Sequence, residues 1–341
     1  MPIKISYIGF SWDPGFAKGE VLAKFLLEGD TITTNINETN VLMIGSTLTP
    51  NEYALVKKCK GLRVLFLSEP ISKLEACSLT YELFTENKYN AVMGCIRNNF
   101  ENSWIKYPLY KYVFSYGENT FNDVNEYVKK CNINDKKICF MANRHDWGNT
   151  RVPIYEKIAQ FAFIDCPGKL LNNCSNEEIN KIGNVEYAKK YLFNICSENF
   201  GTSHPGYITE KLMNASLGGA IPIYFGELDE IDEQIFNRDR ILFLNDENTH
   251  EIAEKVKRLI VNRSNCEASI LGSNCEASIL GSNCEASILG SNCEASIQQK
   301  VGSELDKFYR QPVFMETAHE ALMGMDTRMM KLFDLIRTIV N

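Results

Sequence analysis

The stretch Tyr191–Gly226 reads YLFNICSENFGTSHPGYITEKLMNASLGGAIPIYFG, and its pattern is the clearest indication of the fold. The apolar run Leu192–Cys196 predicts a buried strand, Ile208–Leu217 predicts a helix, and Ala220–Phe225 predicts a second strand. Strands that alternate with helices are typical of parallel sheets with helices on both faces. The stretch therefore predicts an α/β fold, in which ligands bind beyond the carboxyl ends of the strands.

The same alternation continues on both sides of this stretch. Before it we expect the strands and helices Ile3–Phe10, Gly15–Glu28, Asn40–Gly45, Pro50–Cys59, Leu62–Leu67, Asn90–Cys95, Lys137–Met141, Arg151–Phe161, Ala162–Asp165 and a helix end at Glu186–Tyr191. After it we expect a strand at Ile241–Leu244 and a helix at Thr249–Val261. Two such series predict two Rossmann-like domains that face a cleft, residues 1–135 and 136–263, with their boundary in the polar stretch Gly117–Lys137.

A tandem repeat occupies residues 264–297, where the nonapeptide SNCEASILG occurs three times and SNCEASI follows. Nine residues at about 100° per residue place successive copies on opposite sides of a helix, so the repeat does not form one apolar face. We expect a spacer or a partly helical stalk, and an assembly module is the alternative.

The C-terminal tail, residues 298–341, contains an amphipathic helix over Glu316–Val340. Its apolar residues recur at helical spacing: Leu322, Met325, Met329, Leu332, Phe333, Ile336 and Ile339. We expect this face to dock onto the first domain. Formation of a homo-oligomer, through this helix or through the repeat, and peripheral contact with a membrane surface are the alternatives.

The composition excludes several classes of function. Four of the 43 acidic residues lie in the repeat, which has no Lys or Arg, so the rest of the chain has a net charge of −3. Binding of nucleic acid usually needs a basic surface, and no run reaches the roughly 18 apolar residues of a membrane span. The cysteines form no CxxC pair, which argues against zinc and disulfides. We expect a soluble cytoplasmic protein without a signal peptide, a membrane span or a nucleic-acid partner.

Polar residues with useful chemistry follow the strand that ends at Cys196. Ser197, Glu198 and Asn199 come directly after it, and Thr209 stands at the N-cap position of the next helix, ahead of Glu210 and Lys211. A helix N-terminus attracts phosphate groups through its free N–H groups and its dipole. Lys211 would add a full charge for a diphosphate, and Glu210 could accept hydrogen bonds from sugar hydroxyls. In the alternative interpretation, Thr209 and Glu210 only cap the helix and Lys211 is solvated.

The segment Phe193–Gly226 resembles the donor-binding motif of the α1,3/4-fucosyltransferases, FxLxFENSxxxxYVTEKLxxAxxxGxVPIYxG. The resemblance implies that Tyr207, Glu210 and Lys211 contact GDP-fucose. Glu198 and Asn199 match the family's FENS element, whereas Ser197 replaces its aromatic residue and Phe200 replaces its serine. Glu198, Asn199 and Thr209 are therefore also candidates for donor binding.

Two further segments support the resemblance. Cys139–Tyr155, CFMANRHDWGNTRVPIY, is similar to the family's strand, Asn-containing turn and helix that begins with a phosphate-binding arginine. It implies that Asn143 and Arg151 bind the donor, with Arg144 as the alternative to Arg151 for the diphosphate. A guanidinium group at a helix start can form bidentate hydrogen bonds with phosphate oxygens.

The family's proposed catalytic base falls on Glu69, in Leu62–Pro70, LRVLFLSEP. This segment resembles the family's strand that ends in an acidic residue. From position alone, a Glu after a strand would be a cap or a solvated loop residue. Trp104–Tyr110, WIKYPLY, resembles a family segment on the acceptor side but indicates no chemistry. We interpret the acidic stretch Glu227–Glu233, ELDEIDE, as a solvated loop and not as a metal motif.

The resemblance implies a GT-B fold and an inverting glycosyltransferase that needs neither a metal nor a cofactor. The donor substrate would be GDP-fucose, and the partner would be an oligosaccharide acceptor whose N-acetylglucosamine receives fucose in an α1,3 or α1,4 linkage. Two alternatives stay open at this point: a GT-B enzyme that uses another sugar nucleotide, and a non-catalytic glycan-binding or assembly protein.

Overall fold

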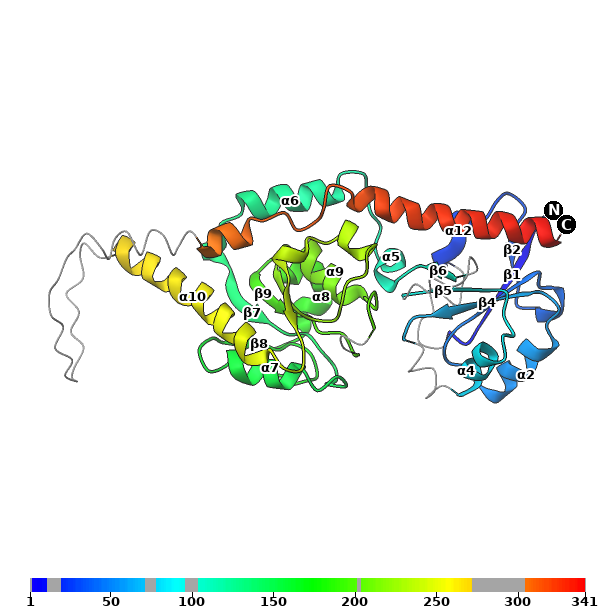
Figure 1. The fold of residues 1–341 in the computed structure, drawn as a ribbon, viewed down its shortest axis with the longest axis horizontal. Coiled ribbons are helices and arrows are strands. Elements are labelled where there is room, and N and C mark those ends of the chain that lie inside the picture. The colour runs from blue at the N-terminus through cyan, green and yellow to red at the C-terminus, as the bar shows by residue number, and fades with distance from the viewer. Residues whose placement is uncertain are drawn as a thin grey trace.

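The structure is a computed structural model, and it describes residues 2–10, 20–70, 78–95, 104–200, 204–271 and 304–340. Two parallel sheets occupy two separate lobes, and the long C-terminal helix runs along the first lobe (Figure 1). The chain therefore has the α/β architecture with two Rossmann-like units that the alternation predicts.

The first sheet has six parallel strands in the order β2-β1-β3-β4-β5-β6. The strands that the sequence predicts are confirmed, and they lie at the centre because continuous apolar runs suit strands buried on both faces. β2 and β6 escaped prediction because they are only two and three residues long. The bounds are β1 Lys4–Ile8, β2 Thr31–Ile32, β3 Val41–Ile44, β4 Leu62–Leu67, β5 Ala91–Gly94 and β6 Trp104–Lys106.

Helices α2, Pro50–Lys58, and α4, Ser78–Thr85, belong to the first lobe. α2 begins where its sequence requires, because Thr49 and Glu52 form a capping box around Pro50. The helix expected over Gly15–Glu28 is only a short 3₁₀ helix, Glu20–Phe25, within the described residues, and residues 11–19 lie outside them.

The second sheet has five parallel strands in the order β11-β10-β9-β7-β8. All five predicted strands and the helices between them are present. α8 contains a break at Gly183, whose φ of 81° is not helical. The bounds are β7 Lys137–Phe140, α7 Arg151–Ile158, β8 Ile164–Asp165, α8 Glu177–Ala188, β9 Tyr191–Ile195, α9 Glu210–Leu217, β10 Ile221–Phe225 and β11 Leu242–Leu244.

The segment between the sheets is more ordered than its polar composition indicates. It contains α5, Leu109–Val113, and α6, Thr120–Lys130, followed by a 3₁₀ helix at Ile133–Asp135. α6 buries Phe121 and Val128 and exposes its charged residues, so the polar stretch in which we expected the domain boundary contains an amphipathic helix.

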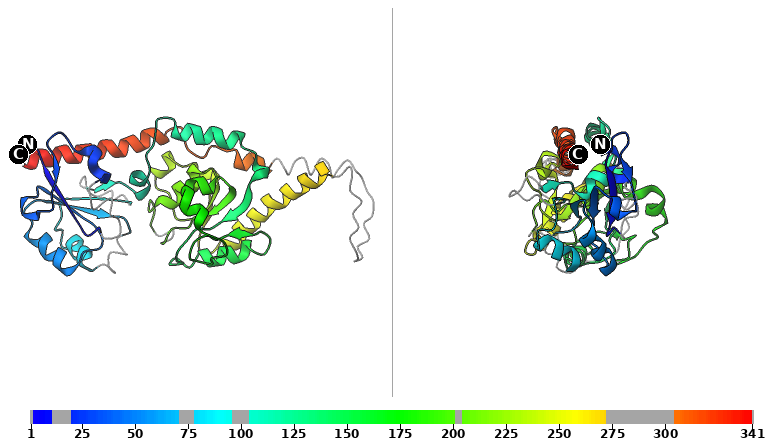
Figure 2. Two further views of the ribbon diagram at one scale, coloured as in Figure 1. Left: turned by 180° about the vertical axis from the view of Figure 1, so that it is seen from behind. Right: turned by 90° about the vertical axis from the view of Figure 1, so that its right-hand side faces the viewer.

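The C-terminal helix α12, Ala318–Val340, returns to the first lobe (Figures 1 and 2). Phe333 stacks on Phe25 with ring centroids 5.8 Å apart, and Asp326 pairs with Lys24 at 2.8 Å. Of the expected apolar stripe only Ile339 is exposed, at 59%. The chain's own residues cover most of this apolar face, and a homo-oligomer or a membrane contact stays an untested alternative.

Helix α10, Thr249–Leu271, extends past the expected end at Val261 into the first copy of the repeat. The rest of the repeat, residues 272–297, lies outside the described residues, and so does the expectation of a spacer or an assembly module. Within the part of the chain that the structure describes, no helix combines the length and the apolar composition needed to cross a bilayer.

Candidate active site

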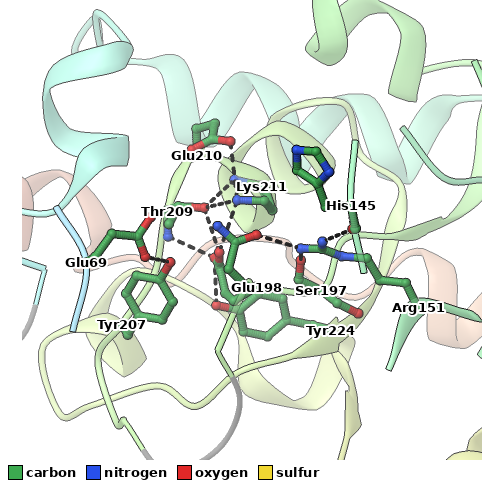
Figure 3. A network of polar contacts seen from close by, with 11 residues as sticks. Glu69, His145, Arg151, Ser197, Glu198, Tyr207, Thr209, Glu210, Lys211 and Tyr224 are labelled. Carbon is green, nitrogen blue, oxygen red and sulfur yellow. Dashed lines mark hydrogen bonds and ion pairs between the residues drawn. The ribbon is translucent and has the colours of Figure 1, made fainter. Parts of the chain in front are cut away.

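Two residues from different sheets meet at the junction of the lobes. Glu69 follows β4 of the first sheet, and Tyr207 precedes α9 of the second. The Tyr207 hydroxyl donates a hydrogen bond of 2.5 Å to Glu69 Oε2 (Figure 3). The sequence predicts Glu69 at the end of a strand, and the structure brings its carboxylate into contact with one of the expected donor-binding residues.

The surroundings of Glu69 favour a proton acceptor. Burial raises the pKa of the Glu69 carboxyl group, and the nearby Glu198 and Glu210 act in the same direction. The hydrogen bond from Tyr207 and the charge of Lys211 oppose this shift without cancelling it. A carboxylate with a raised pKa is a stronger base than one in water, which suits proton abstraction near neutral pH.

Glu198 supports the start of α9 from below. Its Oε1 accepts hydrogen bonds from the Thr209 backbone N–H at 2.8 Å and from the Tyr224 hydroxyl at 3.1 Å. Its Oε2 accepts from Thr209 Oγ1 at 2.7 Å. The Glu198 side chain has no exposed surface, and Thr209 is 1% exposed.

The expectation that Glu198 and Thr209 bind the donor stays a prediction. In this structure both side chains form hydrogen bonds with each other and at the cap of α9. These contacts hold the helix N-terminus and Lys211 in place. Tyr224, which no sequence pattern singled out, belongs to the same network.

Lys211 stays charged in this network. Its Nζ lies 2.9 Å from Thr209 Oγ1, 3.4 Å from Glu198 Oε2 and 3.5 Å from Glu210 Oε1. Burial acts to lower the pKa of Lys211, but the two carboxylates outweigh it and raise the pKa. A cation at the N-terminus of α9 therefore adds its charge to that of the helix dipole.

A groove opens beside Lys211 at the carboxyl ends of β7 and β9. A small cavity of about 70 Å³ is lined by Glu210 and Lys211, and a larger one of about 900 Å³ lies next to it between the loop after β7 and α8. The two cavities share Ala142, Asn143 and Asn184. The larger volume is typical of sites for small molecules and cofactors.

Asn143 is buried in the wall shared by both cavities. Its side-chain oxygen has no hydrogen-bond partner within the described residues. A buried acceptor without a partner is costly, so this oxygen is suited to a donor group on a ligand.

The two candidate arginines occupy different positions. Arg151 is the first residue of α7 and is 2% exposed, and its guanidinium donates to Ser197 O at 2.7 Å, to Asn199 Oδ1 at 3.0 Å and to His145 O. Its Nε has no partner among the described residues. Arg144 is exposed and lines the larger cavity. Arg151 therefore organises the loops around the site, whereas Arg144 faces the open groove.

The acidic stretch after β10 is not the solvated loop that its composition indicates. Asp229 and Asp232 both pair with Lys106, at 2.7 Å and 2.5 Å, and the side chains of Asp232 and Lys106 have no exposed surface. The expectation failed because the pairing residue lies in a distant part of the sequence. The WIKYPLY segment, which indicated no chemistry, supplies Lys106.

The histidines contribute little to a metal site. His145 stacks on the exposed Trp147 with ring centroids 5.2 Å apart, and burial lowers the pKa of His204. Among the residues that the structure describes, no group of three or more His, Cys, Asp or Glu side chains is placed to hold a metal ion.

The second domain is similar to known sequences of one family. Residues 131–267 match the family profile described as "Glycosyltransferase family 10 (fucosyltransferase) C-term". The 4-galactosyl-N-acetylglucosaminide 3-alpha-L-fucosyltransferase 9 of Cricetulus griseus is 29% identical over 139 residues. That stretch makes up 40% of this chain and 37% of the relative, so the match spans well under half of the relative's length.

Solved structures extend the likeness in fold to nearly the whole chain. A crystal structure of an alpha1,3-fucosyltransferase superposes with a TM-score of 0.55 and 18% identity, over 92% of this chain and 93% of that one. The structure titled as its complex with GDP-fucose gives a TM-score of 0.54 and 17% identity over the same shares. The two lobes have the GT-B fold, and residues 131–267 are similar to the C-terminal domain of the glycosyltransferases of family 10, the fucosyltransferases.

Proposed function

We propose that the chain transfers L-fucose from GDP-fucose to a hydroxyl group of a glycan, with inversion at the anomeric carbon. The observation that carries this proposal is the contact of Glu69 with Tyr207, which brings a base of raised pKa from one lobe to the charged N-terminus of α9 in the other. Donor and acceptor would then meet between the lobes.

GDP would occupy the groove beside α9. The diphosphate would lie at the helix N-terminus, where Lys211 and free N–H groups offset its charge, and Arg151 lies close enough to affect the pKa of Lys211. Asn143 and Arg144 would contact the remainder of the nucleotide in the larger cavity. Tyr207, Asn199 and Glu210 would face the fucose.

In the transfer step Glu69 would take the proton of the acceptor hydroxyl. The acceptor oxygen forms a bond to the anomeric carbon while the bond from that carbon to the diphosphate oxygen breaks, and GDP leaves with the electron pair. Tyr207 holds Oε2 of Glu69 through its hydrogen bond. We therefore assign the acceptor proton to the other carboxylate oxygen, Oε1.

The acceptor that we propose is a glycan containing N-acetylglucosamine, fucosylated at O3 or O4. The names of the fucosyltransferases to which the second domain is similar support this choice. We further propose that the enzyme works in the cytoplasm, a reducing compartment, in keeping with the free thiols of the cysteines that the structure describes.

Turnover of GDP-fucose against a glycan array tests the proposal. We expect transfer to glycans with terminal N-acetylglucosamine or N-acetyllactosamine, with loss of transfer in Glu69→Gln and weaker donor binding in Lys211→Ala. A thermal-shift comparison of GDP, UDP, ADP and CMP tests the donor independently. Stabilisation by UDP but not by GDP would contradict the fucosyl assignment and favour another sugar nucleotide.

A further inference from the structure

A buried ionic cluster links the two lobes next to the proposed active site. Lys106 ends β6 of the first sheet, and its Nζ lies 2.5 Å from Asp232 Oδ2 and 2.7 Å from Asp229 Oδ2, in the loop after β10 of the second sheet. The hydroxyl group of Tyr110, in α5, donates a hydrogen bond of 2.9 Å to Asp232 Oδ1. The cluster joins residues more than 120 positions apart in the sequence.

The cluster fixes the geometry more strictly than apolar contacts would. Two carboxylates face a single ammonium group, and Lys106 and Asp232 have no exposed side-chain surface. Moving either lobe away would leave buried charges without partners, which is much more costly than separating two apolar surfaces. The relative position of β6 and the loop after β10 is therefore well defined.

The cluster also contacts the turn that carries Tyr207. Gly206 has a φ of 81°, and a Cβ atom built on it would lie 2.5 Å from Asp229 Oδ2 and 3.1 Å from Lys106 Nζ. The Gly206 N–H donates to Glu227 O at 2.9 Å. Only glycine fits this close approach with a positive φ, so the backbone of the turn rests directly on the ionic cluster.

We propose that Lys106 is a positioning residue: by pairing with Asp229 and Asp232 it fixes the turn at Gly206 and so keeps the Tyr207 hydroxyl on Glu69. The Lys106 side chain has no exposed surface, so we assign it no contact with the donor or the acceptor. The inference rests on the proposed function, in which Glu69 is the base and Tyr207 orients it.

The main test is Lys106→Met in the full chain, assayed with GDP-fucose. We expect kcat to fall by at least about tenfold, since small displacements of reacting groups are costly, while the KM for GDP-fucose stays within about twofold. The acidic limb of the pH profile should move to higher pH, because the hydrogen bond from Tyr207 lowers the pKa of Glu69 and would be weakened.

A double-mutant cycle with Tyr207→Phe separates positioning from general damage. If Lys106 acts through the Tyr207 hydroxyl, Lys106→Met should reduce kcat less in the Tyr207→Phe background than in the wild type. We expect the fold-reduction of kcat to be at least about threefold smaller in that background. Additive effects would overturn the inference, and so would a folded Lys106→Met variant with unchanged kcat and pH profile.

Arg337→Met provides the matched control. Arg337 pairs with the buried Asp30 at 2.6 Å, but this pair joins α12 to the first lobe far from Tyr207 in the chain. Its loss should lower the melting temperature without changing the pH profile. Asp232→Asn covers the case in which Lys106→Met does not fold: it keeps the shape of the cluster, and we expect the same changes in the same direction but smaller.

A crystal structure of the Lys106→Met or Asp232→Asn variant keeps this test separate from the test of the function. A Tyr207 hydroxyl that still lies within hydrogen-bond distance of Glu69 in both variants would overturn the positioning role, whatever the enzyme transfers. An inactive wild-type chain with a displaced Tyr207 in the variants would instead contradict the proposed function alone.

Discussion

The Tyr207 hydroxyl lies 2.5 Å from a carboxylate oxygen of Glu69, although 138 residues separate them in the sequence. This contact places the base of one lobe and the donor side of the other in a single hydrogen-bonded unit.

Glu69→Gln should abolish transfer while preserving donor binding. The amide cannot accept the proton of the acceptor hydroxyl, so we expect kcat to fall by about 10²–10⁴-fold, the range associated with loss of a general base. The Kd for GDP, measured by calorimetry, should stay close to that of the wild type because Glu69 does not line the groove. Full transfer activity in this variant would exclude Glu69 as the base.

The pH dependence of kcat/KM should have an acidic limb that reports Glu69. The folded protein raises the pKa of this carboxyl group above its ordinary value of 4.5, chiefly through burial. The active carboxylate form is therefore lost as the pH falls through this raised pKa. The midpoint of the acidic limb of kcat/KM should consequently lie above pH 4.5. Glu69→Gln should remove this limb from whatever residual activity remains, and a limb that persists would belong to another group.

Arg144 and Arg151 should give different responses when removed. Arg144→Ala should weaken GDP binding and leave the melting temperature unchanged, because the side chain is exposed on the wall of the groove. Arg151→Ala should weaken GDP binding too, and in addition it should destabilise the fold by about 2 kcal/mol or more. The substitution leaves three buried oxygen acceptors without their hydrogen-bond donor. Calorimetry and thermal unfolding of the two variants make the comparison, and equal melting temperatures would contradict it.

Gly168→Ala should disturb the groove without a polar change. A Cβ at this position would lie 2.2 Å from the Asn143 carbonyl oxygen, so the wall that carries the unpaired Asn143 side chain must shift. We expect GDP affinity to fall by about tenfold, the size of one lost buried hydrogen bond. Gly324→Ala in α12 is the control: nothing lies within 4 Å of its added methyl group, and it should stabilise the fold by about 1 kcal/mol without affecting GDP binding.

Chelation should not reduce turnover. The positive end of α9, Lys211 and Arg151 offer charge at the place where the diphosphate would leave, which is the task that a divalent cation performs in other enzymes. We expect the initial rate with millimolar EDTA to equal the rate without it. Loss of activity that Mn²⁺ or Mg²⁺ restores would contradict this mechanism.

The sequence predicted most of the fold because buried parallel strands are continuous apolar runs flanked by polar residues. The sequence did not predict three short or polar elements. β2 and β6 are too short to show a pattern, and in α6 only Phe121 and Val128 are buried among many polar residues. Boundaries were off most clearly at α10, which continues beyond Val261.

Several of the residues that the sequence singles out for the site lie together in the structure, but the sequence does not tell which contacts each of them makes. Glu69, Tyr207 and Lys211 do come together, but Glu198 turned out to be buried beneath α9. A local sequence pattern indicates which residues follow a strand. It does not indicate whether a carboxylate there faces a ligand or is buried against the start of a helix. Lys106 and Asp232 were missed for a related reason, since pairing across 126 residues leaves no mark on either segment.

The path of α12 has a consequence for how the chain folds. Contacts such as Lys24 with Asp326 and Asp30 with Arg337 join residues 302 and 307 positions apart, so the helix that covers the first lobe is synthesised after the second lobe. Part of the apolar surface of the first lobe therefore stays uncovered until the second lobe and the repeat have been made. Deletion of α12 would leave this surface exposed, and the shortened chain should aggregate through its first lobe.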